Sequence, residues 1–148
     1  MNLLAPVSNI MTKDLITVSP NDPLSVVNNI FAKYKIHHIP VVQEGELAGI
    51  ISQSDFLFFK RGFNPSRLVE KMEEIRLHNY AVKDIMTTKL ATLDPRDKII
   101  VALDIFLKNI FHAIPVVDSR RLVGIVTTHD VIKELVKDKH AIAEYDLK

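Results

Sequence analysis

Cysteine is absent from this chain of 148 residues, and its absence removes a group of possible functions. Without a thiol, the protein cannot form a disulfide, a thiolate metal site or a cysteine nucleophile. Such a composition fits a reducing compartment, so we expect a cytoplasmic protein. No apolar run approaches the length of a membrane span. Met1–Ile10 has no basic residue before its short apolar run, so it does not predict a signal peptide.

An excess of charge of either sign is also missing. The 19 basic and 18 acidic residues leave a net charge of +1. A chain so close to neutral has no general electrostatic attraction to nucleic acid or to an anionic membrane, and we expect neither as a partner. Metal-ligand spacing of histidines, a Ser-His-acid triad, a Walker A loop and a dinucleotide-binding glycine pattern are missing as well. We therefore expect a protein that is not an enzyme and needs no cofactor.

One short stretch occurs twice and organises the rest of the chain. Its first copy joins His37–Val42 to Leu47–Asp55, and its second copy joins His112–Val117 to Leu122–Asp130. Corresponding residues of the two copies are separated by one constant interval, without a gap. Two copies are too few for a solenoid, whose repeats must keep stacking. We therefore expect two half-domains that cover each other's apolar faces.

Each copy predicts a strand, a turn, a second strand and the start of a helix. A strand and a helix are expected before each copy: Leu15–Val18, Leu24–Lys35, Leu90–Leu93 and Ile99–Ile110. Asp22 and Asp97 are the expected N-caps of these helices, and Pro23 is the expected first helical residue of the earlier one. The fold class is therefore α+β, with two β-α-β-β-α repeats.

Ser66–Asn79 is the long segment that has no counterpart in the other repeat. Its apolar residues form one helical stripe: Leu68, Val69, Met72 and Ile75. We interpret this segment as a helical bridge. The expected division is a first repeat with its N-terminal lead-in over residues 1–65, the bridge over 66–81, and a second repeat with its C-terminal helix and tail over 82–148.

The strand-to-helix junctions combine a hydroxyl with an acid, as Ser52 with Asp55 and Thr127 with Asp130. One interpretation is a capping box, in which these groups only satisfy backbone amides at a helix start. The other is a ligand site. A helix start attracts phosphate, and a carboxylate one turn later can accept both hydroxyls of a ribose. Gly49 just before the first junction lacks a Cβ, so ligand or backbone can approach there, and the second repeat has the same arrangement.

Two further features have a structural and a functional interpretation each. His37 and His112 precede their Ile-Pro pairs by the same interval. They either pack or face solvent, or they donate to a phosphate in a junction cleft. The row Phe56–Phe59, with Phe63, is too apolar for one helix face. It packs in a core or covers a dimer surface.

Together these residues resemble the cystathionine β-synthase (CBS) domain pair, also called a Bateman module. The matching pieces are the two Ile-Met-Thr stretches at Ile10–Thr12 and Ile85–Thr87, the pairs Thr17-Val18 and Thr92-Leu93, and the two copies described above. The resemblance covers nearly the whole chain. It implies a stand-alone protein in which two repeats pack sheet to sheet about a pseudo-twofold axis and form one compact module.

The resemblance also implies a ligand. Family clefts between the repeats commonly hold AMP, ADP, ATP or S-adenosylmethionine, so an adenine nucleotide is the expected regulatory ligand. The residues implied to bind it are Leu15, Ile16, Thr17, His37, Ile39, Pro40, Ser52 and Asp55 in the first repeat, and Leu90, Ala91, Thr92, His112, Ile114, Pro115, Thr127 and Asp130 in the second.

By position, the two acids would hold ribose hydroxyls, and Ser52 and Thr127 would contact phosphate. The other residues would line the adenine pocket, except His37 and His112, which match the phosphate-facing histidine of the γ subunit of AMP-activated protein kinase. That subunit often has arginine beside this histidine, where His38 and Ala113 stand here. The lower fixed charge favours AMP over di- and triphosphates.

The expected function is a non-catalytic regulatory module, because such modules usually control an attached enzyme, channel or transporter. Here it would act on a separate, unidentified protein partner, or as a homodimer whose shape changes. The alternative is a ligand-independent interaction scaffold, suggested by the surplus of apolar residues at Phe56–Phe63. In that case both junction motifs would be helix caps only.

Overall fold

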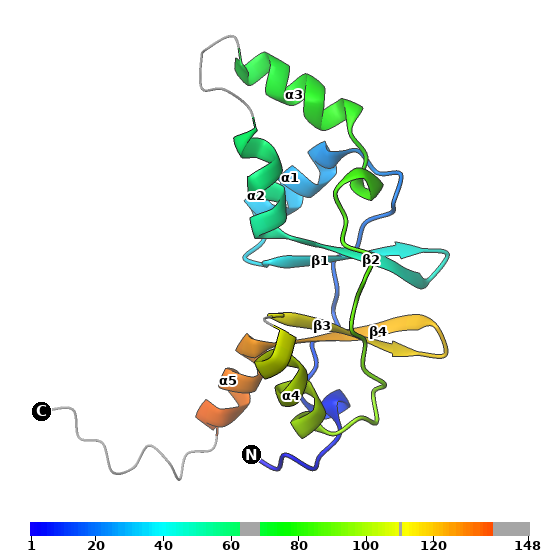
Figure 1. Ribbon diagram of the computed structural model, residues 1–148, viewed down its shortest axis with the longest axis vertical. Helices are drawn as coiled ribbons and strands as arrows, with labels where there is room; N and C mark the ends of the chain where they lie inside the picture. The colour runs from blue at the N-terminus through cyan, green and yellow to red at the C-terminus, as the bar shows by residue number, and fades with distance from the viewer. Residues whose placement is uncertain (63–68, 110, 138–148) are drawn as a thin grey trace, which may run out of the picture. The chain divides into compact units, whose positions relative to one another are not determined.

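The computed structural model describes residues 1–62, 69–109 and 111–137. The chain divides into two compact units that do not follow the order of the sequence. One unit is Leu15–Leu90, and the other combines Met1–Asp14 with Ala91–Lys148. Each unit has its own hairpin and its own helices (Figure 1).

The first unit, Leu15–Leu90, is built on an antiparallel hairpin of β1 (His38–Gln43) and β2 (Glu46–Ser52). Its helices are α1 (Leu24–Lys33), α2 (Gln53–Arg61) and α3 (Val69–Asn79), and a 3-10 turn spans Val82–Asp84. Helices α1 and α2 lie over one face of the hairpin (Figure 1). The core between them is apolar and fully buried at its centre, with Leu24, Val27, Ile39, Val41, Ile51 and Phe56.

The second unit repeats this plan. Its antiparallel hairpin consists of β3 (Ala113–Asp118) and β4 (Arg121–Thr127), and its helices are α4 (Ile99–Asn109) and α5 (Thr128–Lys137). A 3-10 turn at Val7–Asn9 belongs to the same unit. The core is formed by Val7, Leu93, Ile99, Ala102, Ile114, Val116 and Val126. The prediction of an α+β fold with two repeats is confirmed.

Each unit buries the segment with which the other repeat begins. Val7 has 0% exposure in the core of the second unit, and its amide donates to the carbonyl of Asp97 at 2.7 Å. Val82 has 0% exposure in the core of the first unit, and its amide donates to the carbonyl of Asp22 at 2.9 Å. The predicted division at 1–65, 66–81 and 82–148 follows the sequence repeats and stays a prediction, whereas the compact units are cut at other points.

The two strands predicted before the helices are reduced to a single bridged residue each, so their predicted lengths are wrong. Only Val18 and Leu93 pair there, through isolated parallel bridges to β1 and β3. Val18 donates its amide to the carbonyl of Pro40 at 3.2 Å. The next bond of a parallel ladder would need an amide hydrogen on Pro40, which proline lacks. Because Pro115 occupies the matching place in the second unit, both ladders stop after one bridge.

Asp22 and Asp97 are not the helix caps that we expected. The carboxylates of Asp22 and Asp97 accept hydrogen bonds from the amides of Ser19 and Asp94, each at 2.8 Å. They therefore hold the turn before each helix. The N-cap of α1 is Pro23, which has extended backbone and no side-chain cap, so the prediction that Pro23 opens the helix is also wrong.

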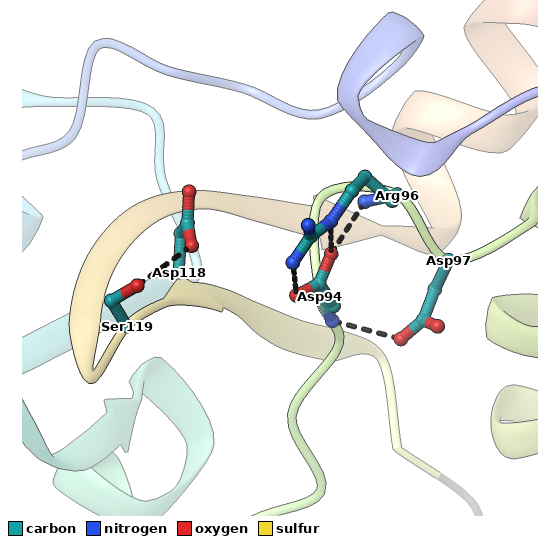
Figure 2. Close-up of polar contacts among 5 residues, drawn as sticks. All are labelled: Asp94, Arg96, Asp97, Asp118 and Ser119. Atoms are coloured by element: carbon teal, nitrogen blue, oxygen red, sulfur yellow. Dashed lines mark hydrogen bonds and ion pairs between the residues drawn. The ribbon is translucent and has the colours of Figure 1, made fainter.

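The turn before α4 carries an ion pair as well (Figure 2). The guanidinium of Arg96 donates to both carboxylate oxygens of Asp94, at 2.7 Å each. Hydrogen bonds from this side chain and from the Arg96 amide lower the pKa of Asp94 to about 2. The hydrogen bonds to Asp94 and its charge raise the pKa of Arg96, and Asp118, at the end of β3, adds a smaller electrostatic attraction. These contacts fix the turn that leads into α4.

The apolar row of α2 divides between core and surface. Phe56 is buried and its ring lies 5.7 Å from that of Phe31, and Phe59 lies 5.3 Å from the ring of Tyr80. Leu57 and Phe58 are exposed, at 44% and 79%. The remaining member of the row, Phe63, lies outside the described residues.

The predicted helical bridge is present as α3, but its stripe does not face the core. Met72 and Ile75 are 61% and 58% exposed, whereas Leu77 is buried. The salt bridge between Lys60 and Glu73, at 3.1 Å, links α2 to α3. Leu68 lies outside the described residues.

Candidate functional site

In the first unit, the predicted ligand residues gather at the open end of the β1–β2 hairpin. His38 pairs with Ser52 there, so the end of β2 and the start of α2 lie beside the start of β1. The amide of Gln53 donates to the carbonyl of His37 at 2.8 Å, which fixes His37 against the start of α2. The segment Leu15–Thr17 runs directly into the bridge that Val18 makes with β1.

The second unit brings its predicted residues together in the same way. Ala113 pairs with Thr127 at the open end of the β3–β4 hairpin. The amide of Thr128 donates to the carbonyl of His112 at 3.1 Å, and Leu93 bridges to β3 directly after Ala91 and Thr92. Leu90 is the exception, because it falls in the first compact unit.

Burial decides which of these residues can offer a side chain. Ile39 and Ile114 have 0% exposure and belong to the two cores, so only their backbone can contact a ligand. Pro40 and Pro115 are buried too. The side chains that remain exposed are those of Thr17, His37, Asp55, Thr92 and His112. The junction surfaces are therefore polar, with an apolar floor.

Ser52 is the N-cap of α2. Its hydroxyl oxygen accepts a hydrogen bond from the amide of Asp55 at 3.1 Å and lies 3.1 Å from the hydroxyl of Ser54. The carboxylate of Asp55 is exposed, and no hydrogen bond to it occurs among the described residues. Since the second half of a capping box requires that carboxylate to accept the cap's amide, the box is only half formed here.

Thr127 and Asp130 form the complete box at the start of α5. The amide of Asp130 donates to the Thr127 hydroxyl at 3.2 Å, and the Asp130 carboxylate accepts from the Thr127 amide at 2.8 Å. The Thr127 hydroxyl donates to the same carboxylate oxygen at 2.6 Å. The other oxygen accepts from the hydroxyl of Thr12 at 3.1 Å. The hydrogen bonds of a capping box are therefore complete at the second junction and half formed at the first.

The two glycines before the junctions lie so close to other protein atoms that a Cβ at either position would clash. A Cβ on Gly49 would lie 2.9 Å from the sulfur of Met86, and one on Gly124 would lie 2.6 Å from the sulfur of Met11. Carbonyl oxygens of the threonines that follow these methionines are also within about 3 Å. The Ile-Met-Thr stretches therefore dock against the hairpins, which gives the glycines their physical reason.

Other parts of the described chain are weaker candidates for a ligand site. A hollow of about 290 Å³ lies at the β1–β2 turn, far along the hairpin from the junction. Its lining includes Glu44 and Glu46, whose charges repel phosphate. Among the described residues, no group of three or more His, Asp and Glu is placed to hold a metal ion. The helices of the described chain fall short of the length and apolar character needed to cross a membrane.

Two contact residues were missed by the sequence-based prediction. Thr12 was noted as part of an Ile-Met-Thr stretch, but no role was assigned to it, although its hydroxyl reaches Asp130. Ser54 lies between the hydroxyl and the acid of the first motif, and the motif alone assigns no role to it. Its hydroxyl lies beside that of Ser52, and the second repeat has His129 in its place.

Comparison with known families and proteins supplies independent findings. The family model for the CBS domain matches residues 7–62 and 82–137. Inosine-5'-monophosphate dehydrogenase of Thermoplasma acidophilum is 31% identical over 124 residues, which is 83% of this chain. The matched region spans 22% of that enzyme's length.

Two solved structures share the fold over nearly their whole chains. The CBS domain pair of protein MJ0100, in complex with 5'-methylthioadenosine and S-adenosyl-L-methionine, is 26% identical with a TM-score of 0.71, and the match covers 90% of this chain and 98% of that one. CBSX2 in complex with AMP has a TM-score of 0.75 at 23% identity, with coverage of 91% and 98%.

Proposed function

This chain belongs to the CBS domain family, and on that premise we propose that it is a non-catalytic regulatory module that binds an adenine nucleotide. AMP is the favoured ligand, ahead of ADP, ATP and S-adenosylmethionine. Binding would alter the shape of the module, or of a homodimer of it, and a separate cytoplasmic protein would respond. A ligand shifts such an equilibrium only as far as it binds the two states with different affinity.

The observation that carries the proposal is the arrangement at the two hairpin ends. In each unit, a helix start, a hydroxyl, an acid and the backbone of an exposed histidine lie together. Helix starts offer free amides and a positive dipole end for a phosphate. A carboxylate one turn later can accept the two hydroxyls of a ribose through charge-assisted hydrogen bonds, each contributing about 1.5–3 kcal/mol.

The ligands of a relative support the same chemical class. The two molecules bound to the MJ0100 domain pair both contain an adenosine group, so they share an adenine base and the two ribose hydroxyls. Recognition of adenosine alone does not need a high fixed positive charge. The exposed histidines of this chain, beside His38 and Ala113, suit a monophosphate better than a triphosphate, whose charge calls for several cations.

Calorimetric titration of the purified protein, freed of any ligand carried over from expression, tests the proposal. We expect AMP to release heat and bind more tightly than ADP, ATP or S-adenosylmethionine, and we expect GMP, the matched control, to bind at least tenfold more weakly. An absence of heat and of any thermal shift with all four adenine compounds would contradict the proposal.

A ligand-independent scaffold is the second candidate function, and the exposed apolar side chains on α2 favour it. Phe58, at 79% exposure, and Leu57, at 44%, adjoin each other on this helix. Exposed apolar groups of this size can mark a protein interaction surface. Binding of a protein partner that is equally tight with and without AMP, and that is lost in Phe58→Ser, would favour the scaffold.

A further inference from the structure

The two junctions carry the same acid but differ in how that acid is bonded. Both oxygens of the Asp130 carboxylate accept hydrogen bonds, one from the amide and hydroxyl of Thr127 and the other from the hydroxyl of Thr12. Asp130 is half-buried, whereas Asp55 is exposed. The Asp55 carboxylate accepts no hydrogen bond within the described part of the chain, and only its amide is held, by Ser52.

The neighbour of each acid gives a physical reason for this difference. The Ser52 hydroxyl lies 3.1 Å from the hydroxyl of Ser54, so one of these two hydroxyls can donate a hydrogen bond to the other. The second repeat has His129 at the position of Ser54. With no competing hydroxyl there, Thr127 turns its proton toward Asp130 and bonds to it at 2.6 Å.

In the second unit, the lead-in also donates a hydrogen bond to the acid. Thr12 exchanges two backbone hydrogen bonds with Ile125, at 2.9 and 3.0 Å, and its hydroxyl then reaches Asp130 at 3.1 Å. Thr87 exchanges the same two bonds with Ile50, at 2.9 and 3.0 Å. No hydrogen bond from the Thr87 hydroxyl to Asp55 occurs among the described residues, although the residue types match.

We infer that Asp130 is a structural clasp that ties the lead-in to the start of α5, and that the ribose of the nucleotide is held at the Asp55 junction. The second half of this inference rests on the proposed function. A carboxylate has about four acceptor sites, and three of those of Asp130 are occupied. A ribose that offered both of its hydroxyls to Asp130 would have to displace at least one of these donors, which would then lose its partner. At Asp55 it would gain the same acceptor and displace no bond found in the described chain.

A matched pair of variants, Asp55→Ala and Asp130→Ala, tests the clasp in the absence of nucleotide. We expect Asp130→Ala to lower the urea midpoint of unfolding and Asp55→Ala to leave it within error. Thr12→Val, which removes the hydroxyl and keeps the volume, should also lower the midpoint, while the control Thr87→Val should not. Equal loss in the two acid variants would overturn the clasp. If Asp130→Ala does not fold, the two threonine variants decide the question.

AMP titration of the same proteins tests the assignment of the ribose. We expect about one AMP per chain, an affinity at least tenfold weaker in Asp55→Ala, and a change below about threefold in Asp130→Ala and Thr12→Val. Equal weakening by the two acid variants, or two equivalent sites per chain, would overturn the assignment. If the unmodified protein binds none of the adenine compounds, the proposed function fails and with it the ribose assignment, while the unfolding data still judge the clasp.

Discussion

At the scale of single residues, hydrogen bonds from a neighbouring residue set the pKa of Asp94. Arg96 forms a two-pronged contact with Asp94, and the Asp94 carboxylate also accepts a hydrogen bond from the Arg96 amide at 2.9 Å (Figure 2). Hydrogen bonds to the charged form favour ionisation, which is why the pKa of Asp94 falls from 3.8 to about 2. A carboxyl group whose pKa is lower in the folded state than in the unfolded state stabilises the fold above its unfolded pKa.

We predict that Arg96→Ala returns the pKa of Asp94 toward 3.8, because the largest cause of its shift is the Arg96 side chain. The contribution of Asp94 to stability is complete above pH 3.8 and is lost as the pH falls toward 2. NMR titration of the carboxyl carbon gives the pKa directly. The free energy of unfolding should change less with pH across that window in the variant than in the unmodified protein. The prediction is wrong if Asp94 titrates at the same pH in both proteins.

At the scale of elements, the two hairpins differ in their turns. Glu44 and Gly45 have φ values of 51° and 83°, and Ser119 and Arg120 have values of 49° and 71°. Both pairs fit the two-residue type I′ turn, whose twist suits antiparallel strands. Only the first turn has a glycine at its second position. A residue with a Cβ pays about 1–2 kcal/mol for left-handed backbone. The β3–β4 turn has two such residues and the β1–β2 turn has one, so the β3–β4 turn is the more strained.

Arg120→Gly should therefore stabilise the protein, by about 0.5–1 kcal/mol after the larger chain entropy of glycine is subtracted. The matched reverse change, Gly45→Ala, should destabilise it by about 1 kcal/mol. Urea unfolding monitored by circular dichroism measures both free energies of unfolding. A lower midpoint in Arg120→Gly would show that the arginine side chain contributes more than its backbone strain costs.

At the scale of the whole molecule, each compact unit depends on the lead-in of the other repeat. The lead-in of the second unit reaches its core through Val7, and that of the first unit does so through Val82. Both side chains are fully buried. Removal of buried methyl groups costs their transfer free energy and leaves a cavity. Damage to a lead-in should therefore appear in the unit that it packs into.

Val7→Ala should cost about 1–3 kcal/mol of stability. Amide hydrogen exchange should lose protection in α4, β3 and β4, which share a core with Val7, more than in α1, β1 and β2. Val82→Ala is the matched variant and should show the opposite pattern, since its core contains β1 and α1. Loss of protection in α1 and β1 on Val7→Ala would contradict the assignment of this lead-in.

The hairpins, the helices and both junctions could be predicted because their signals are local. Strand alternation, turn residues and a hydroxyl three positions before an acid need only neighbours in sequence. The roles of Asp22 and Asp97 were missed because a carboxylate can bond backward to a turn as well as forward to a helix.

The difference between the two acids could not be predicted from their motifs. It depends on whether Ser54 or its histidine counterpart adjoins the acid, and on a hydroxyl from Thr12, which is 118 positions from Asp130. Such long-range partners become visible only when the chain is folded. The ligand residues implied by the family resemblance stay predictions, although most of each set lies at one hairpin end.

Because each lead-in packs into the unit of the other repeat, the chain cannot be split simply between its two repeats. A cut in the segment 63–68, where the repeats themselves would suggest it, separates each unit from a piece that it needs. The upstream fragment keeps Val7 without the core that buries it and loses Val82, and the downstream fragment has the converse defect. Neither fragment should fold by itself, yet the two mixed together contain everything required, so reconstitution from halves should succeed where isolation fails.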